Sequence, residues 1–112
     1  MPRCAIGLGG NLGDVPAAFA TALQRLAQSN CTVVVVSRLY VTRAVGPQAG
    51  ADFHNACALI DTDLAPHDLL DVLQQIEHEA GRTPTVRWGS RPLDIDLLTC
   101  GDLVLNLSLI HI

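Results

Sequence analysis

The sequence predicts one small α+β domain, in which an antiparallel sheet is covered by two helices. Three observations lead to this class. The chain has 112 residues, the length of a single domain. Apolar residues make up 49% of the chain and charged residues 16%, which excludes intrinsic disorder as the main state. Short apolar runs typical of strands alternate with two segments of helical periodicity, in the order β-α-β-β-α-β.

The chain opens with a predicted strand, Arg3–Leu8, followed by a glycine-rich segment at residues 7–14. A glycine-rich turn between a strand and a helix can bind a dinucleotide, but the spacing here is wrong. Gly7-x-Gly9 is followed by Leu12 where the third glycine belongs. The segment also lacks the Gly-Lys-Ser/Thr of a P-loop. We therefore expect a tight strand-to-helix turn.

The first helix is predicted from its capping residues and its apolar face. Asp14 can cap the helix and Pro16 suits its first turn. Ser29-Asn30 is expected to end it, and Cys31–Tyr40, rich in β-branched residues, predicts the second strand. The apolar face is expected to consist of Phe19, Ala22, Leu23 and Leu26.

The second half of the chain repeats the pattern. Thr42–Ala51 contains glycine and proline and predicts a loop, and Asp52–Thr62 predicts the third strand. Pro66 suits the first turn of a second helix, and Gly81 is a natural stop. The apolar stripe of this helix is expected to consist of Leu69, Leu73, Ile76 and Ala80.

The last part of the chain supplies the fourth strand. Arg82–Pro92 is irregular and basic, Leu93–Cys100 is typical of a strand, and a Gly101-Asp102 turn leads to an apolar run from Leu103. The order β-α-β-β-α-β is the split βαβ pattern. It predicts a ferredoxin-like sandwich whose mainly antiparallel sheet carries both helices on one face. The other face is then available for a functional site.

Asp94-Ile95-Asp96 is the strongest candidate for chemistry. Side chains alternate along a strand, so both carboxylates should point to the same face. Two adjacent carboxylates repel each other, and a divalent cation such as Mg²⁺ relieves that repulsion. The alternative is an ordinary exposed strand face, because any half-buried strand shows this alternation.

The segment before these carboxylates favours a phosphate ligand. Arg82, Arg87 and Arg91 lie within ten positions, with Trp88 among them and no acidic residue between them. Guanidinium groups beside paired carboxylates suit a complex of polyphosphate with Mg²⁺, the combination that phosphoryl transfer requires. The alternative is a solvated loop whose arginines form ion pairs with the two aspartates.

Phe53 and Asn55 share one face of their predicted strand and could hold a flat heterocycle. The ring would stack on it and the amide would donate and accept hydrogen bonds. The alternatives are a core position for Phe53 and local backbone contacts for Asn55. His54, His67 and His78 are expected to be exposed and receive no role.

Charge and cysteine content limit the partners. The net charge of −4 argues against a broad nucleic-acid surface. The longest strongly apolar run, Val33–Val36, is too short to span a membrane, and we expect no signal peptide because the N-terminal residues include no long apolar region. The four cysteines lack zinc-site spacing, and we expect buried free thiols in a reducing cytoplasm.

Three separate motifs, in order, resemble the 6-hydroxymethyl-7,8-dihydropterin pyrophosphokinase family. Residues 6–14, Ile-Gly-Leu-Gly-Gly-Asn-Leu-Gly-Asp, are similar to its N-terminal signature, with Gly10 where the family usually has Ser. Residues 40–42, 46–48 and 52–56 resemble its pterin-binding segment, with Ala51 where Pro is common. Residues 87–98, Arg-Trp-Gly-Ser-Arg-Pro-Leu-Asp-Ile-Asp-Leu-Leu, resemble its catalytic signature.

The resemblance implies transfer of pyrophosphate from ATP to the hydroxymethyl group of the pterin in folate biosynthesis, with release of AMP. The implied catalytic residues are Arg82, Arg91, Asp94 and Asp96, and the two aspartates would hold two Mg²⁺ ions. The implied ATP-binding residues are Gln74, Glu77, Arg82, Arg87, Trp88 and Arg91. The implied pterin-binding residues are Thr42, Ala44, Val45, Phe53, Asn55 and Trp88.

The resemblance covers Arg3 to Asn106, and family members continue several tens of residues further. Residues 107–112 do not resemble the family; the codons CTG-TCT-CTT-ATA-CAC-ATC encode them and match a transposon end used in sequencing libraries. We therefore expect a pyrophosphokinase domain at residues 1–106 that lacks its C-terminal part, a non-native tail at 107–112, and no activity from this segment alone.

Two other functions remain open on the sequence. The first is a small module that binds a nucleotide or a pterin without turnover. The second is an interaction domain that binds neither, which would leave the paired aspartates and clustered arginines unexplained. Metal-dependent ATP affinity and AMP production would distinguish the enzyme from both.

Overall fold

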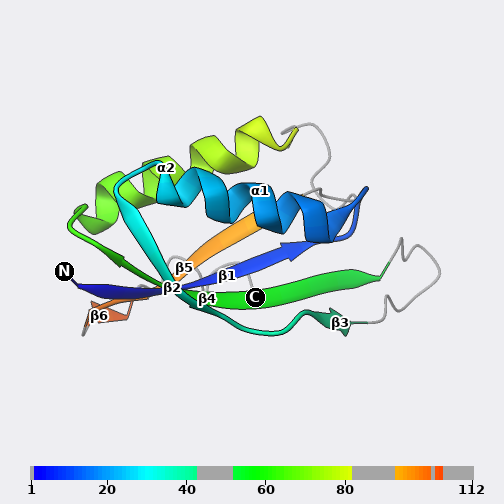
Figure 1. The fold of residues 1–112 in the computed structure, drawn as a ribbon, viewed down its shortest axis with the longest axis horizontal. Coiled ribbons are helices and arrows are strands. Elements are labelled where there is room, and N and C mark those ends of the chain that lie inside the picture. Colours follow the sequence, from blue (N-terminus) through cyan, green and yellow to red (C-terminus); the bar gives the residue numbers. More distant parts are fainter. Residues whose placement is uncertain (1, 43–51, 82–92, 102, 105–112) are drawn as a thin grey trace.

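A computed structural model describes residues 2–42, 52–81, 93–101 and 103–104 (Figure 1). The elements are, in order, β1 (Arg3–Gly10), α1 (Val15–Ala27), β2 (Cys31–Val36), β3 (Tyr40–Thr42), β4 (Phe53–Thr62), α2 (Pro66–Glu79), β5 (Asp94–Cys100) and β6 (Leu103–Val104). The strand order is β2-β4-β1-β5-β6, with β3 also paired to β4, and every pair is antiparallel. Both helices cover one face of the sheet, so the predicted ferredoxin-like α+β fold is confirmed (Figure 1).

The core lies between the helices and the sheet and is almost entirely aliphatic. Strands β1, β4 and β5 contribute alternate side chains, and α1 and α2 contribute helically spaced ones, as the sequence pattern predicted. The largest fully buried residues include Ile6, Leu26, Ile60, Leu69, Leu73 and Leu93. Burial of each such side chain stabilises the fold by roughly 1.5–3 kcal/mol. Phe19 is the one aromatic residue in this cluster.

The helix ends follow the predicted capping chemistry. Asp14 Oδ1 accepts a hydrogen bond from the Ala17 amide at 3.1 Å, which satisfies one of the donors left over in the first turn of α1. Both helices are followed by a residue in the left-handed region. Asn30, after α1, has a φ of 64°, and Gly81, after α2, has a φ of 94°. Glycine adopts that conformation without steric cost.

The first strand is longer than the sequence predicted. The expected turn at residues 7–14 is wrong in its first half, because β1 continues to Gly10 and so includes Gly7 and Gly9. This strand is bonded on one side to β4 and on the other to β5, and two ladders outweigh the weak strand propensity of glycine. The turn itself begins beyond Gly10 and includes Gly13, whose φ is 73°.

The single strand predicted at Cys31–Tyr40 is wrong, because the structure divides it into β2 and β3. Ser37 interrupts the ladder. Its amide donates to the Cys57 carbonyl at 2.8 Å, while its hydroxyl oxygen accepts from the Cys57 amide at 2.9 Å. The serine side chain thus takes the place of a backbone acceptor and the strand leaves its register.

The four cysteines are free, as expected, but they are not all buried. Cys4 and Cys31 are buried and Cys100 is half-buried, whereas Cys57 is exposed because it points to the face of the sheet that carries no helix. Neither helix in the described part of the chain has the length and apolar character that crossing a membrane requires. The expected domain end at Asn106 and tail at 107–112 lie outside the described residues.

Candidate functional site

The face of the sheet opposite the helices carries the predicted site residues. In β5, Ile95 and Leu97 are buried against the helices, so Asp94 and Asp96 project from the other face and are partly exposed. In β4, the buried residues are Ala56, Ala58, Ile60 and Thr62. Phe53 and Asn55 have the opposite parity and therefore share the open face with the two aspartates.

A strip of glycine separates these two groups. Gly9 of β1 is directly opposite Asn55 on one side and Asp94 on the other, while Gly7 is opposite Cys57 and Asp96. At these two positions β1 therefore has no side chain between the two neighbouring strands. Adjacent strands are about 4.8 Å apart, which leaves roughly 10 Å of flat backbone surface between the Asn55 and Asp94 strands. We call Gly7 and Gly9 the glycine strip.

The strip is closely bounded on its β4 side. A Cβ atom added at Gly9 would lie 3.4 Å from Asn55 Oδ1, at the short end of ordinary van der Waals contact. The Asn55 amide group is held there by Thr42, whose Oγ1 accepts a hydrogen bond from Asn55 Nδ2 at 3.1 Å. With its donor engaged by β3, the amide directs its oxygen toward the strip. That oxygen is an acceptor for a ligand lying on the glycines.

Of the residues implied to bind a pterin, the structure brings three together. Thr42 pairs with Phe53 across β3 and β4, and both lie beside Asn55 on the open face. Ala44 and Val45 lie outside the described residues. The same is true of Arg82, Arg87, Trp88 and Arg91, so the predicted arginine cluster is not among the residues the structure places.

The two aspartates fit a hard divalent cation. They are two residues apart on one strand face, a separation of roughly 6.6 Å along the strand. Within the residues that the structure describes, no group of three or more His, Cys, Asp or Glu side chains is placed to hold a metal. Two carboxylates, with substrate phosphates and water as the other ligands, are the usual protein contribution to a Mg²⁺ site.

Glu77 has a structural role that the sequence analysis missed. Its side chain is only 6% exposed, and its Oε2 accepts a hydrogen bond from the Ile95 amide at 2.8 Å. Ile95 lies between the two aspartates, so α2 fixes the backbone of the strand that carries them. The signal was present in the sequence, because Glu77 follows Leu73 by four residues and so falls on the apolar stripe of the helix. Gln74, the other implied ATP contact of α2, is exposed.

His54 is half-buried rather than exposed, a correction to the sequence analysis, and its Nδ1 has no hydrogen-bond partner among the described residues. Its parity places it on the helix side of β4, where it pairs with Gly10 and Val41. His67 and His78 are exposed, as predicted.

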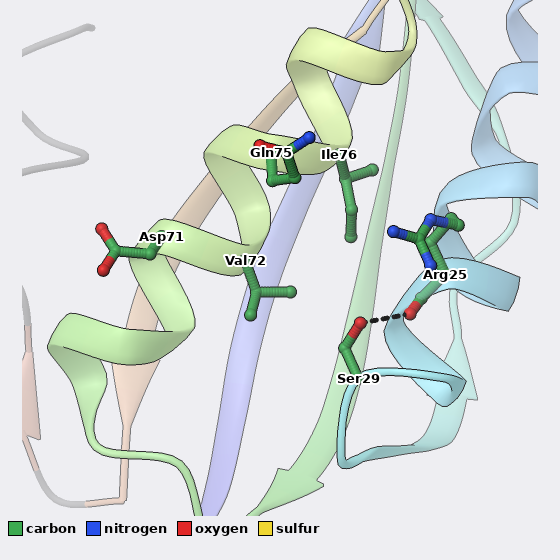
Figure 2. Close-up of a pocket in the computed structure, with 6 residues that line it drawn as sticks. All are labelled: Arg25, Ser29, Asp71, Val72, Gln75 and Ile76. Atoms are coloured by element: carbon green, nitrogen blue, oxygen red, sulfur yellow. Dashed lines mark hydrogen bonds between the residues drawn. The ribbon is translucent and has the colours of Figure 1, made fainter.

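A separate hollow of about 210 Å³ opens between the two helices, away from the open face of the sheet. Figure 2 shows Arg25 and Ser29 at the end of α1 facing α2 across it. The Arg25 guanidinium is engaged there by the Glu79 carboxylate, with contacts of 2.7 and 3.0 Å. On the α2 side the hollow is lined by Asp71, Val72, Gln75 and Ile76. None of these six residues belongs to the predicted site.

Known proteins match both the sequence and the fold. One relative is the 2-amino-4-hydroxy-6-hydroxymethyldihydropteridine pyrophosphokinase of Haemophilus influenzae. It is 43% identical to this chain over 102 residues, which are 90% of this chain and 64% of that protein. The enzyme of the same name from Pseudomonas aeruginosa is 43% identical over 108 residues, 94% of this chain and 65% of that protein. The chain therefore spans just under two thirds of the length of these relatives.

A solved structure, the C-terminal domain of the MgtC protein from Mycobacterium tuberculosis, superimposes with a TM-score of 0.50 at 9% identity and covers 87% of each chain. That likeness concerns the fold alone. The sequence model of one family, described as 7,8-dihydro-6-hydroxymethylpterin-pyrophosphokinase, matches residues 5–112. With this match over nearly the whole chain, the protein belongs to the 7,8-dihydro-6-hydroxymethylpterin-pyrophosphokinase family.

Proposed function

We propose that the protein transfers pyrophosphate from ATP to the hydroxymethyl group of 6-hydroxymethyl-7,8-dihydropterin in folate biosynthesis and releases AMP. One observation carries the proposal beyond family membership. The strand with the paired aspartates and the strand with Asn55 and Phe53 lie on either side of the glycine strip, on one open face. Two substrates can therefore meet on a surface that has no side chain between them.

The pterin lies on the β4 side of the strip in this proposal. The Phe53 ring stacks on the heterocycle, and the Asn55 oxygen accepts a hydrogen bond from its edge. Thr42 supports this contact by holding the Asn55 donor at 3.1 Å, so that the amide meets the pterin with a fixed orientation. The loop that follows, with Ala44 and Val45, supplies backbone contacts. A preorganised amide lowers the entropic cost of orienting the substrate.

ATP lies on the β5 side, with its phosphates toward Asp94 and Asp96. The two carboxylates would hold two Mg²⁺ ions, which would neutralise the phosphate charge and orient the attacking oxygen. Arg82 and Arg91 bind the phosphates. Arg87, Trp88, Gln74 and Glu77 complete the proposed ATP contacts. Glu77 also supports the strand through its hydrogen bond to the Ile95 amide.

The reaction transfers one group in a single displacement. The hydroxymethyl oxygen of the pterin bonds to the β-phosphorus of ATP, and the bond from that phosphorus to the oxygen shared with the α-phosphate breaks. AMP leaves with the electron pair, and the hydroxyl proton is released to solvent. Catalysis here consists of positioning and charge neutralisation. The four free cysteines favour a reducing compartment, so we place this activity in the cytoplasm.

The test is AMP release by the full-length protein with ATP, Mg²⁺ and the pterin, comparing Asp96→Asn and Asp94→Asn with a matched control. Asp63→Asn removes the same charge at an exposed position outside the sheet. We expect each site variant to lose about 100-fold or more in rate, as expected when a metal ligand is removed, with an unchanged circular dichroism spectrum. The control should retain full activity.

Two results would contradict the proposal. One is AMP release by Asp96→Asn within twofold of the parent at saturating Mg²⁺. The other is Mg²⁺-independent binding of ATP by the parent protein without AMP production, which would indicate a non-catalytic binding module.

A further inference from the structure

Two cysteines face each other across the central strands, at the end of the sheet away from the aspartates. Cys4 of β1 is directly opposite Cys100, the last residue of β5. A register shift brings them together, because β5 has one extra residue, Leu98, opposite the Ala5–Ile6 step. Without this bulge Cys100 would lie opposite Arg3 and point to the open face.

The hydrogen-bond pattern fixes the spacing of this pair. The Gly101 amide donates to the Arg3 carbonyl at 2.7 Å, so Arg3 and Gly101 form a hydrogen-bonded pair. Pairs alternate along an antiparallel ladder, which makes Cys4 and Cys100 a non-hydrogen-bonded pair with Cα atoms about 4.5 Å apart. Disulfides span Cα separations of about 4.4–6.8 Å, so the separation expected for this pair lies within the range that a disulfide bridges.

Both thiols lie on the helix side. Cys4 is fully buried, and Cys100 is half-buried and packs against the core cluster. Burial first, and then the neighbouring Cys100 thiol, raise the pKa of Cys4 to about 12. Cys4 is therefore a poor first nucleophile, whereas Cys100 is the partner that a small oxidant can reach.

We propose that Cys4 and Cys100 are a redox-active dithiol, which small disulfides of the glutathione type convert to an intramolecular disulfide joining β1 to β5. The Cys100 thiolate attacks one sulfur of the small disulfide and expels one thiolate, which leaves a mixed disulfide on Cys100. Cys4 attacks the Cys100 sulfur, its proton passes to the departing sulfur, and the second small thiol leaves. Two protein thiols are oxidised, and one small disulfide is reduced to two thiols.

The location gives the disulfide a structural consequence. The bond would tie the end of β5 to β1 four residues from Asp96, and would close a loop that contains most of the chain. In a reducing cytoplasm such a bond forms transiently, when the ratio of oxidised to reduced small thiols rises. Cys57 is the exposed competitor, since it can react with the same oxidant but has no thiol opposite it.

Trypsin separates the four thiols and makes the test direct. Cleavage after arginine places Cys4 on residues 4–25, Cys31 on 26–38, Cys57 on 44–82, and Cys100 on a peptide that starts at residue 88. The native full-length protein is treated with glutathione disulfide, its remaining thiols are alkylated, and the non-reduced digest is analysed by mass spectrometry. We expect a cross-linked pair of the Cys4 and Cys100 peptides, about 2 Da lighter than their sum and separated by dithiothreitol.

Variants make the assignment specific. Cys57→Ser should still give the cross-link, and Cys100→Ser should abolish it. Glutathione found on Cys57 alone, a cross-link between Cys4 and Cys31, or a stable mixed disulfide on Cys100 would each overturn the proposal. The peptide map of the unmodified sequence decides the question even where a cysteine variant does not fold.

Discussion

Replacing Glu77 by alanine tests how α2 supports the strand that carries the aspartates. The Glu77 side chain is 6% exposed, and its Oε2 accepts from the Ile95 amide at 2.8 Å. Truncation leaves that buried amide without its acceptor, which costs roughly 1–3 kcal/mol, and a hydrogen bond to a charged acceptor contributes roughly 1.5–3 kcal/mol. These two figures describe the same loss, so we expect the free energy of unfolding to fall by about 2–3 kcal/mol.

Glu77→Gln is the matched control. It keeps an acceptor oxygen at the same reach and should lower the free energy of unfolding by less than about 1 kcal/mol. Urea unfolding at pH 7, followed by far-ultraviolet circular dichroism, measures both variants. An unchanged slope with denaturant would show that the compactness of the native and unfolded states is preserved. Equal stability of the alanine variant and the parent would refute the supporting role.

Activity separates this role from direct contact with the nucleotide. If Glu77 acts on the strand alone, Glu77→Gln should retain the ATP affinity and the rate of AMP release of the full-length parent. If the carboxylate itself binds the nucleotide, the same variant should lose ATP affinity while its free energy of unfolding stays near that of the parent. The two measurements together assign the residue.

Three further predictions concern the helix cap, the glycine strip and an exposed ion pair. Asp14→Ala should lower the free energy of unfolding by about 1 kcal/mol and Asp14→Ser should restore most of it, measured by urea unfolding. Gly9→Ala should raise the pterin KM in the AMP assay of the full-length protein more than Gly7→Ala does, because an added Cβ lies 3.4 Å from Asn55 Oδ1 at Gly9 but 3.8 Å from Leu98 Cδ1 at Gly7; a KM unchanged in the Gly9 variant would contradict the site. The hydrogen bond from Arg25 lowers the pKa of Glu79 in the folded state, so this pair stabilises the fold above the ordinary glutamate pKa, and that contribution is lost as the pH falls through the lowered value. Urea midpoints between pH 7 and pH 3 should therefore fall less in Glu79→Gln than in the parent, and identical pH profiles would contradict the linkage.

Much of the fold could be predicted because local signals agreed with the final arrangement. Alternation placed Asp94 and Asp96 on one face of β5, and the structure confirms it. Asp14 and Gly81 fixed the start of α1 and the end of α2 through capping chemistry that acts within a few residues. These features depend on neighbours in the chain, which a sequence shows directly.

The differences arise where distant strands decide the outcome. Gly7 and Gly9 suggest a turn by their local propensity, yet β4 and β5 hold them in an extended strand. The Ser37 hydroxyl ends β2 by bonding to Cys57, twenty residues away. The bulge at Leu98 could not be predicted from the local sequence either, because a bulge is defined only relative to the partner strand. In each case the partner, and not the local pattern, determines the conformation.

The two faces of the central strand, β1, have different roles: one face packs in the core and the other forms part of the proposed substrate surface. Toward the helices, β1 presents Cys4, Ile6 and Leu8, each 3% exposed or less, and these side chains join the core. Toward the open face it presents Arg3 and Ala5, and then Gly7 and Gly9, which carry no side chain. Glycine weakens a strand, and ladders on both sides of β1 offset that cost. Because the two faces alternate residue by residue, substitutions at even-numbered positions from 4 to 8 should act mainly on stability. Substitutions at Gly7 and Gly9 should act mainly on the surface where the two substrates are proposed to meet.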